Sequence, residues 1–290
     1  MTPVAPWPEV KLWRKEARQR MLAARAAMTM AVREELSHRL IAQLRPVLKG
    51  RPGPVSFYWP IKAEPDLKPL MRELDEAGMA VCLPVCIKLG EPLTFRRWTK
   101  GAKMERGFWD IPVPADPTEI RPRTLIAPIV GYDGAGYRLG YGGGFFDRTL
   151  AKFAGDAAAI GIGWSLFRLP TIHPQPHDVR MSAIVTEIGG LADAAARASS
   201  VCSLDEAPDA YAGFATDAEI VATLGGLRNA LPPERQALVD YALWQLDAEA
   251  PAAPDCATAP TETLAALLPR VRSDTLHATL AALRATLESA

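Results

Sequence analysis

The chain carries the run RLGYGGGFFDR at residues 138–148, and this run is the most informative part of its sequence. An apolar stretch typical of a buried strand, residues 124–130, precedes the run, and a helix-like stretch, residues 145–153, completes it. Glycines before a helix let bare backbone approach a ligand, and the first N–H groups of a helix have no partner within the helix. Such a helix start binds anions, phosphate above all. The run therefore predicts a polyphosphate site.

Charged side chains within the run support the same interpretation. Arg138 and Arg148 can add charge-assisted hydrogen bonds to phosphate, and Asp147 can hold the magnesium ion that accompanies a nucleotide. The run differs from a P-loop, which needs Lys-Ser/Thr where Phe145 and Phe146 stand, and its glycine spacing is not that of the dinucleotide fingerprint. A flexible glycine turn without a ligand is the simpler alternative, and the flanking charges weigh against it.

Strand-like and helix-like stretches alternate on both sides of the glycine run. Residues 9–49 have a helical pattern, with a second periodic stretch from Val32 to Leu48, and the pattern ends at the Pro-Gly pair near residue 52. The predicted strands cover residues 55–59, 79–85, 93–98, 124–130, 157–164 and 183–186, the predicted helices residues 66–77 and 145–153, and residues 107–122 are a proline-rich connection. This alternation predicts an α/β fold, a three-layer sandwich around a largely parallel or mixed sheet. Ligands of such folds bind beyond the carboxyl ends of the strands, where the glycine run lies.

After Gly190 the sequence becomes alanine-rich and loses its strand patterns. We therefore predict an α/β domain over residues 1–195 and an acidic, mainly helical extension over residues 196–290. The extension is expected to contain three helices: one from a capping pattern at Thr216 to about Leu231, one over residues 234–249, and one after a cap at Ser273. Residues 251–260 are the expected linker. The last helix has a packing face of Leu276, Leu280, Leu283 and Leu287. The short turn between residues 263–268 and 273–287 has a faint likeness to a helix-turn-helix, which is weak in such acidic surroundings.

Composition and charge limit the possible functions. With 290 residues, 49% of them hydrophobic, the chain can bury a large core. It has no apolar stretch of bilayer length and no signal-like segment at its start, so we expect a cytoplasmic protein that does not bind membranes. Residues 201–290 carry five arginines and thirteen acidic residues, a net charge of −8, and the rest carries +8. A basic catalytic part suits anionic small molecules, and an acidic tail argues against nucleic acid as a partner.

The four cysteines are too few and too scattered for a disulfide framework. Cys82 and Cys86 lie an even number of residues apart in one strand-like run, so they are expected on one face as buried free thiols. A zinc site is not expected from them, because no matching pair of cysteines or histidines accompanies them.

With these features in view, the first 190 residues resemble the 5-formyltetrahydrofolate cyclo-ligases, also called methenyltetrahydrofolate synthetases. The resemblance rests on the run at 138–148, preceded by Gly131-Tyr132-Asp133, and on shorter matches in the same order. These matches are Tyr58-Trp59-Pro60, Glu64-Pro65-Asp66, Trp109 to Pro114, His177-Asp178 and Thr186-Glu187. The last 90 residues match nothing associated with this family.

The resemblance implies an enzyme that uses ATP and Mg²⁺ to close a reduced folate, 5-formyltetrahydrofolate, to 5,10-methenyltetrahydrofolate, with release of ADP and phosphate. A formamide oxygen is a poor leaving group, so ATP must first convert it into a phosphate ester. In phosphoryl transfer the protein mainly positions groups and neutralises charge. Such a reaction needs backbone N–H groups, arginines and a metal ion, which the glycine run offers, and no nucleophilic serine or cysteine.

The resemblance also implies the residues that bind ATP. They are Arg14, Arg18, Arg138, Leu139, Gly140, Tyr141, Gly142, Gly143, Gly144 and Phe145. Arg14 and Arg18 are four residues apart and so share a helix face, although a solvated basic face explains that spacing equally well. Arg14 stands where the family has a lysine, unless Lys15 takes that place. Arg138 and Asp147 are the expected catalytic residues, with Asp147 as the metal ligand.

Tyr58, Glu64 and Trp109 are the residues that the resemblance assigns to the folate. A carboxylate at Glu64 suits the donor edge of a pterin, and the indole of Trp109 can stack on the flat ring. The simpler alternatives are a core position for Tyr58 and a helix-start role for Glu64. Phe146 replaces a tyrosine of the family and removes one hydroxyl. His177-Asp178 is expected to order its own loop by a hydrogen bond to backbone.

Two other functions stay open. A non-catalytic paralogue would bind nucleotide or folate and act through its helical tail. A sugar-phosphate isomerase would use the glycine run for a single phosphate, although no acid/base pair suggests one. The expected assembly is a monomer or a small homo-oligomer, with the tail either packed on the catalytic domain or forming the oligomer.

Overall fold

The computed structural model describes residues 6–153, 155–192, 215, 217–246, 260–271 and 274–289. These residues form two compact units. The first takes its described residues from positions 1–18, 34–164 and 168–195, and the second from positions 19–33, 165–167 and 196–290. The second unit therefore includes two short segments of the first 190 residues. The division of the chain into domains at residue 195 stays a prediction.

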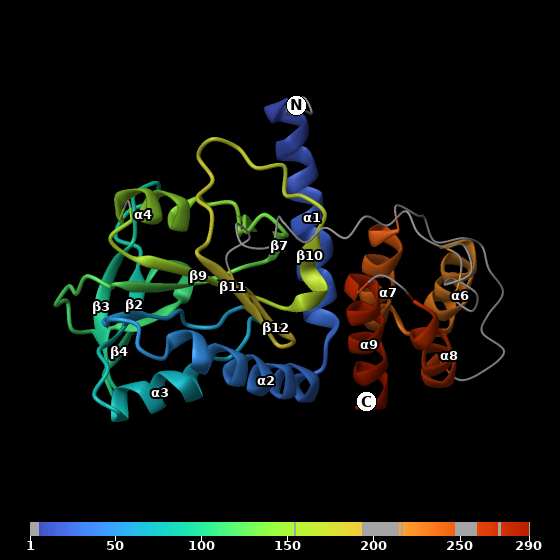
Figure 1. Ribbon diagram of the computed structural model, residues 1–290, viewed down its shortest axis with the longest axis horizontal. Helices are drawn as coiled ribbons and strands as arrows, with labels where there is room; N and C mark the ends of the chain where they lie inside the picture. The colour runs from blue at the N-terminus through green and yellow to red at the C-terminus, as the bar shows by residue number, and fades with distance from the viewer. Residues whose placement is uncertain are drawn as a thin grey trace. The chain divides into compact units, whose positions relative to one another are not determined.

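A seven-stranded sheet forms the centre of the first unit (Figure 1). Its strands, in the order in which they lie side by side, are β12 (Gly189–Ala192), β11 (Ala183–Thr186), β9 (Ala158–Ile162), β6 (Thr124–Pro128), β1 (Val55–Ser56), β2 (Val81–Val85) and β3 (Thr94–Trp98). The five central strands are parallel, and the two edge strands are antiparallel to their neighbours. The predicted α/β class with a mixed sheet is confirmed.

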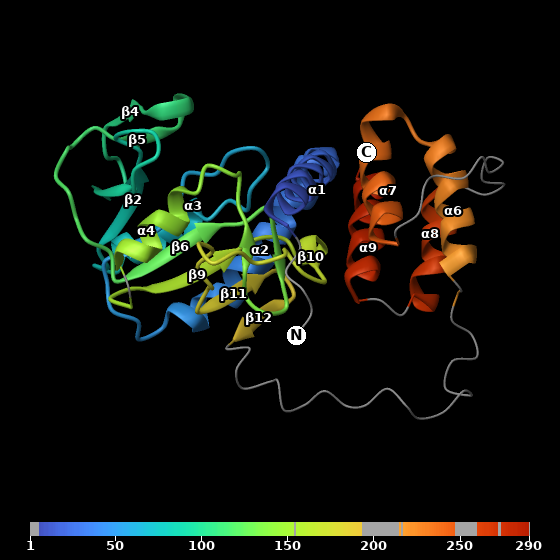
Figure 2. The same ribbon diagram turned by 90° about the horizontal axis from the view of Figure 1, so that it is seen from above.

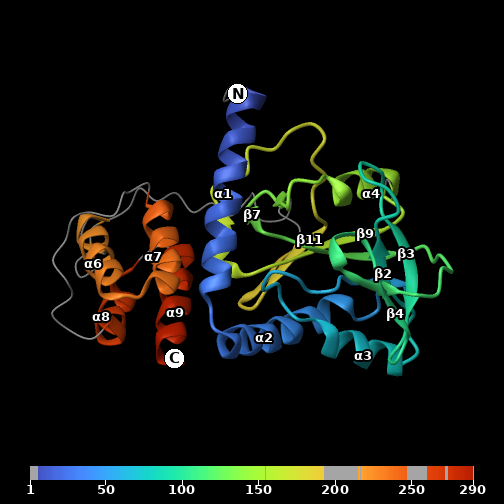
Figure 3. The same ribbon diagram turned by 180° about the vertical axis from the view of Figure 1, so that it is seen from behind.

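Helices cover both faces of this sheet. Helices α2 (Met30–Leu48) and α3 (Lys68–Glu76) lie on one side, and α4 (Phe145–Phe153) lies on the other (Figures 1 and 3). The predicted helical region over residues 9–49, with its second periodic stretch from Val32 to Leu48, forms two helices, α1 (Trp7–Ala27) and α2. Thr29 lies at the break, where its hydroxyl accepts a hydrogen bond from the Val32 N–H at 3.4 Å, an N-cap that starts α2.

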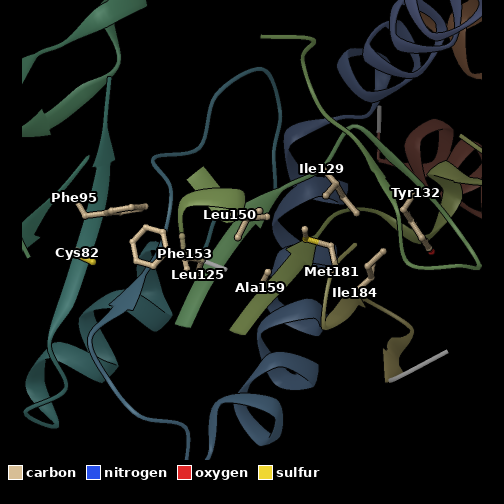
Figure 4. Close-up of a cluster of buried hydrophobic side chains, with 11 residues drawn as sticks. Cys82, Phe95, Leu125, Ile129, Tyr132, Leu150, Phe153, Ala159, Met181 and Ile184 are labelled. Atoms are coloured by element: carbon tan, nitrogen blue, oxygen red, sulfur yellow. The ribbon is translucent and has the colours of Figure 1, made fainter. Parts of the chain in front are cut away.

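The core between the sheet and α4 follows from the alternation of side chains along the strands. Leu125 and Ala127 on β6 point to the same face of the sheet, and both belong to one buried cluster with Leu150 and Phe153 of α4. Figure 4 shows Leu125, Leu150 and Phe153 close together in this cluster. The ring of Phe95 on β3 meets Phe153 edge to face, with ring centres 6.0 Å apart. The remaining members of this buried cluster are Cys82, Ile129, Tyr132, Ala159, Met181 and Ile184. The cluster fixes α4, and so the glycine run before it, against the sheet.

Several strands are shorter than the sequence predicts. Strand β1 ends after Ser56, although residues 57 and 58 remain buried, and β6 ends at Pro128. The predicted connection over residues 107–122 contains a turn of 3-10 helix, η1 (Phe108–Asp110), and the strand β5 (Pro112–Pro114), which pairs with β4 (Met104–Arg106). A second small sheet, which the sequence did not predict, consists of β7 (Gly131–Asp133), β8 (Arg138–Leu139) and β10 (Arg168–Leu169). The glycine run thus begins on a hairpin strand.

The winding of the sheet reverses between β1 and β6. From β1 the chain continues to β2 on one side, and from β6 it continues to β9 on the other. Ligands of open α/β sheets bind in the crevice outside the carboxyl ends of strands at such a switch point. The segment that leaves β1 leads to Glu64, and the segment that leaves β6 leads to the glycine run. The topology alone therefore brings these two sequence motifs to the same edge of the sheet.

The second unit is helical (Figure 2). Its helices are α6 (Asp217–Ala230), α7 (Pro233–Gln245), α8 (Pro260–Leu267) and α9 (Asp274–Glu288). Leu276, Leu280 and Leu283 are buried, which confirms their packing face, and Leu287 is half-buried. The predicted caps at Thr216 and Ser273 and most of the predicted linker lie outside the described residues. Helix α7 ends at Gln245 rather than at residue 249, and residue 260, predicted as linker, begins α8.

Segments from early in the chain belong to the core of this helical unit. The hydroxyl of Tyr241, which is fully buried, donates to the backbone carbonyl of Leu166 at 3.0 Å, and its ring centre lies 5.3 Å from that of Phe167. Arg235 donates to the carbonyl of Ala27 at 3.0 Å. The C-terminal helices therefore pack on residues 19–33 and 165–167. Within the described ranges, no helix is both long and apolar enough to cross a bilayer.

Candidate active site

The glycine run adopts a backbone that needs glycine. Gly142 and Gly144 have φ angles of +94° and +63°, which L-residues rarely adopt. A Cβ at Gly143 would lie 2.8 Å from the ring of Phe145, whereas a Cβ at Gly140 would meet no atom within 4 Å. Residues 141–143 are exposed. The run is therefore an open loop of bare backbone that ends at the start of α4.

Arg18 of α1 reaches this loop from outside the run. Its Nε donates to the carbonyl of Gly140 at 2.8 Å, and its guanidinium carbon lies 3.3 Å from where a Cβ of Gly142 would stand. Burial lowers the pKa of Arg18, the charge of Arg14 lowers it further, and Asp178 opposes the shift. Arg18 thus places a half-buried positive charge against the glycines.

Arg138 and Asp147 bind each other. Their Nη2 and Oδ1 atoms are 2.9 Å apart, with side chains 3% and 23% exposed. Both also bond to the backbone of Val179, whose carbonyl accepts from Arg138 at 3.1 Å and whose N–H donates to Asp147 Oδ1 at 3.2 Å. Burial lowers the pKa of Arg138, and the charge of Asp147 acts in the opposite direction. Arg138 therefore holds Asp147 in place from beneath the loop.

Arg14 is buried, so the alternative of a solvated basic face is wrong for it. Its Nε donates to Ile172 O at 3.0 Å, its Nη2 to His173 O at 3.0 Å, and its Nη1 to Asp178 Oδ1 at 3.1 Å. The other oxygen of Asp178 accepts the Gln175 N–H at 2.7 Å. The predicted loop-ordering hydrogen bond of His177-Asp178 is confirmed at Asp178, and Arg14 contacts this loop rather than the glycine run.

Glu64 is buried and points at the glycine run. Its Oε1 accepts the Tyr141 hydroxyl at 2.7 Å, and its Oε2 accepts the Ile61 N–H at 2.8 Å. Helix α3 begins only at Lys68, so Glu64 is not a helix-start residue. The turn before Glu64 contains two residues with positive φ, Lys62 at +47° and Ala63 at +59°. Strained backbone of this kind costs about 1–3 kcal/mol per residue and persists only where its surroundings enforce it.

Lys62 is a cation of this site that sequence reasoning missed. Its Nζ lies 5.4 Å from the ring centre of Tyr141, and the residue is exposed. No local pattern marks it, because its position over Tyr141 depends on the strained turn and on a loop far away in sequence.

Trp109 meets the other end of the glycine run. It is 61% exposed, and its ring centre lies 5.4 Å from that of Phe145, edge to face. Trp109 and Asp110 both have positive φ, +55° and +62°, so an exposed indole is held on strained backbone. Tyr58, in contrast, is buried, and its hydroxyl donates to Pro65 O at 2.9 Å. Tyr58 therefore supports the segment of Glu64 and does not face the open loop.

The remaining predicted residues have supporting positions. The side chain of Leu139 is buried, so only its backbone can face a ligand, and the ring of Phe146 lies 6.0 Å from the guanidinium carbon of Arg138. Cys82 is a buried free thiol as predicted, and burial raises its pKa to about 12. Cys86 is only half-buried and follows the end of β2. In the described ranges, no group of three or more His, Cys, Asp or Glu side chains could hold a metal ion.

Comparison with known proteins gives a consistent result. A family described as the 5-formyltetrahydrofolate cyclo-ligase family matches residues 10–187. The 5-formyltetrahydrofolate cyclo-ligase of Mycolicibacterium smegmatis is 31% identical over 187 residues, which cover 61% of this chain and 95% of that protein. The protein of the same name from Escherichia coli is 27% identical over 172 residues, 56% of this chain and 93% of that one.

Solved structures agree with the sequence matches. The NMR structure of Aquifex aeolicus 5,10-methenyltetrahydrofolate synthetase is similar with a TM-score of 0.55 and 25% identity, over 61% of this chain and 91% of that chain. The synthetase from Mycoplasma pneumoniae has the same fold, with a TM-score of 0.50 and 21% identity over 60% of this chain and 98% of that chain.

Proposed function

This chain belongs to the 5-formyltetrahydrofolate cyclo-ligase family, and from that premise we propose that it uses ATP and Mg²⁺ to convert 5-formyltetrahydrofolate into 5,10-methenyltetrahydrofolate, ADP and phosphate. One observation carries most of the support: the Tyr141 hydroxyl lies 2.7 Å from Glu64. This contact joins a buried carboxylate to an open glycine loop at the switch point of the sheet. A carboxylate and a phosphate cradle side by side suit a substrate pair of pterin and nucleotide.

The glycine loop and Arg18 are the proposed triphosphate site. Backbone N–H groups at the start of α4 favour an anion, and the absence of side chains at residues 142–144 lets phosphate oxygens approach. Mg²⁺ is usually held by one or two carboxylates together with substrate phosphates, and Asp147, the third residue of α4, supplies one carboxylate beside the loop. When bound, the ion neutralises charge on the phosphates. Arg138 fixes the orientation of that carboxylate.

Glu64 and Trp109 are the proposed folate site. The oxygens of Glu64 can accept the N–H groups on the edge of a pterin, and the exposed Trp109 can stack on its face. The formyl oxygen attacks the γ-phosphorus of ATP. The bond between that phosphorus and ADP breaks, and a phosphate ester of the formyl group forms. The second folate nitrogen then attacks the formyl carbon, loses its proton and expels phosphate. The protein positions both substrates and adds no covalent step of its own.

The proposal is tested by incubating the full-length protein with 5-formyltetrahydrofolate and MgATP. The strongly absorbing methenyl product should appear together with one ADP for each folate closed. Folded protein that binds both ligands in calorimetry but yields no product would overturn the proposal and support the non-catalytic paralogue.

The position of Gly140 gives a test of the phosphate cradle. Since a Cβ there meets no protein atom, Gly140→Ala should leave stability within about 0.5 kcal/mol of wild type. If phosphate approaches this backbone, the added methyl group should raise the KM for ATP about tenfold, which corresponds to ~1.4 kcal/mol. Steady-state kinetics with varied ATP measure the effect.

Gly142→Ala is the matched comparison for that variant. Its positive φ predicts a loss of stability of about 1 kcal/mol or more, visible in thermal unfolding. An unchanged KM for ATP in Gly140→Ala would place the triphosphate away from residue 140.

A further inference from the structure

Residues 172–179 form a segment, here called the crosspiece, that is tied to the rest of the first unit at both ends. At its start, the Ile172 N–H donates to Asp133 Oδ2 at 3.1 Å. Asp133 is 2% exposed, and its other oxygen accepts the N–H groups of Ala135 and Tyr137 at 3.1 and 3.0 Å. One buried carboxylate therefore fixes both the β7–β8 hairpin and the beginning of the crosspiece.

Arg14 fixes the crosspiece along its length. The guanidinium group spans two backbone carbonyls and the carboxylate of Asp178, and both side chains are almost fully buried, at 6% and 8% exposed. Buried charges of this kind are stable only when both partners are present and hydrogen-bonded. Two edge-to-face ring contacts flank the pair, Trp7 with His177 at 5.5 Å and Trp13 with His173 at 4.7 Å.

The end of the crosspiece touches the predicted metal ligand. Val179 directly follows Asp178, and its N–H donates to Asp147 Oδ1 while its carbonyl accepts from Arg138. Asp147 is thus held by two groups, one of which is backbone. The position of the Val179 backbone depends on the residue before it, Asp178, which is fixed by its ion pair with Arg14.

We propose that the Arg14–Asp178 pair is a positioning device for Asp147, and that Arg14 acts in the reaction through the crosspiece and not by binding phosphate. This inference rests on the proposed function, because the position of Asp147 matters for turnover only if that carboxylate holds Mg²⁺.

The shape of the guanidinium group makes the proposal testable. Arg14 uses three nitrogens on different acceptors, and a lysine offers a single ammonium that cannot reproduce the fork. Arg14→Lys therefore keeps a positive charge for any phosphate but loses the anchor. If Arg14 binds phosphate, Arg14→Lys should retain most of its function. If Arg14 fixes the crosspiece, Arg14→Lys should lose that function.

The experiment measures the Mg²⁺ concentration for half-maximal activity in the wild type, Arg14→Lys, Asp178→Asn and the double variant. Each single change should raise this Mg²⁺ concentration about tenfold and leave the KM for folate within about twofold of wild type. The double variant should need no more Mg²⁺ than either single variant, because the effects of residues in one network do not add. Arg45→Lys is the matched control, because Arg45 makes a two-pronged pair with Glu73 that is about half exposed. Arg45 lies in the last turn of α2, on the opposite face of the sheet from α4 (Figure 1).

A second readout does not depend on turnover. Calorimetry of Mg²⁺ with a non-hydrolysable ATP analogue should show weaker metal binding in Arg14→Lys and Asp178→Asn, and wild-type binding in Arg45→Lys. If Arg14→Lys does not fold, Trp7→Ala, which removes a 45% exposed ring from the same anchor, should fold and weaken metal binding two- to threefold.

Two results would overturn the proposal. One is unchanged metal binding in folded anchor variants. The other is a raised KM for ATP at saturating Mg²⁺ in Arg14→Lys, which would make Arg14 a phosphate ligand. Wild-type protein that forms no methenyl product would instead refute the proposed function. The role of the crosspiece in holding Asp147 would then be tested by Mg²⁺ binding in calorimetry alone.

Discussion

Asp147→Asn should lower kcat by about 100- to 1,000-fold, the usual effect of removing one electrostatic group from a transition state. The change removes the negative charge that the proposed metal ion needs and keeps the size of the side chain. It also leaves the guanidinium of Arg138, with a side chain only 3% exposed, without its counter-charge. We therefore expect a stability loss of about 3 kcal/mol as well, seen as a lower Tm.

Two comparisons separate the metal role of Asp147 from its structural role. Arg138→Met breaks the same ion pair but retains the carboxylate, so it should lose stability and yet recover much of its turnover at high Mg²⁺. Asp156→Asn removes an exposed carboxylate just beyond α4, paired with Arg121, and should change neither quantity. Asp147→Asn with near wild-type turnover would remove Asp147 from the metal site.

Local signals in the sequence were sufficient for much of this fold. Helix α4 begins and ends where the pattern predicts, because glycines precede it and its apolar face is regular. The parallel sheet follows from the alternation of strands and helices. The ends of strands were less accurate, since residues 57 and 58 are as buried and apolar as a strand but leave the sheet to reach Glu64. Burial looks the same in the sequence whether or not a ladder partner exists.

The site could be predicted only as a list of residues and not as contacts. The glycine run, Glu64 and Trp109 were found because each belongs to a recognisable local motif. The partner of Arg14, in contrast, lies 164 residues away, and Glu64 meets a tyrosine 77 residues later. Pairing over such distances depends on the topology of the sheet. This is why Arg14 was assigned to phosphate, although the structure commits its nitrogens to the crosspiece.

Glu64→Gln should lower kcat/KM for 5-formyltetrahydrofolate by about 1,000-fold or more, since a site built to pair with polar groups strongly rejects a mismatch. The amide replaces one acceptor with a donor that faces the N–H edge of the pterin. The KM for ATP should stay within about twofold, because the triphosphate does not contact Glu64 in the proposed arrangement. Steady-state kinetics with each substrate varied in turn give both values, and Glu73→Gln, at an exposed position on α3, is the control.

Tyr141→Phe shows whether Glu64 contacts the substrate or only tethers the glycine loop. This variant removes the 2.7 Å hydrogen bond and leaves the carboxylate intact. If Glu64 were only a tether, Glu64→Gln should lose no more activity than Tyr141→Phe, because the carbonyl oxygen of glutamine can still accept the tyrosine hydroxyl. If the carboxylate binds the pterin, Tyr141→Phe should lose about tenfold, the contribution of one hydrogen bond, and Glu64→Gln far more. A loss of activity in Glu64→Gln that is equal to or smaller than the loss in Tyr141→Phe would therefore refute Glu64 as the folate ligand.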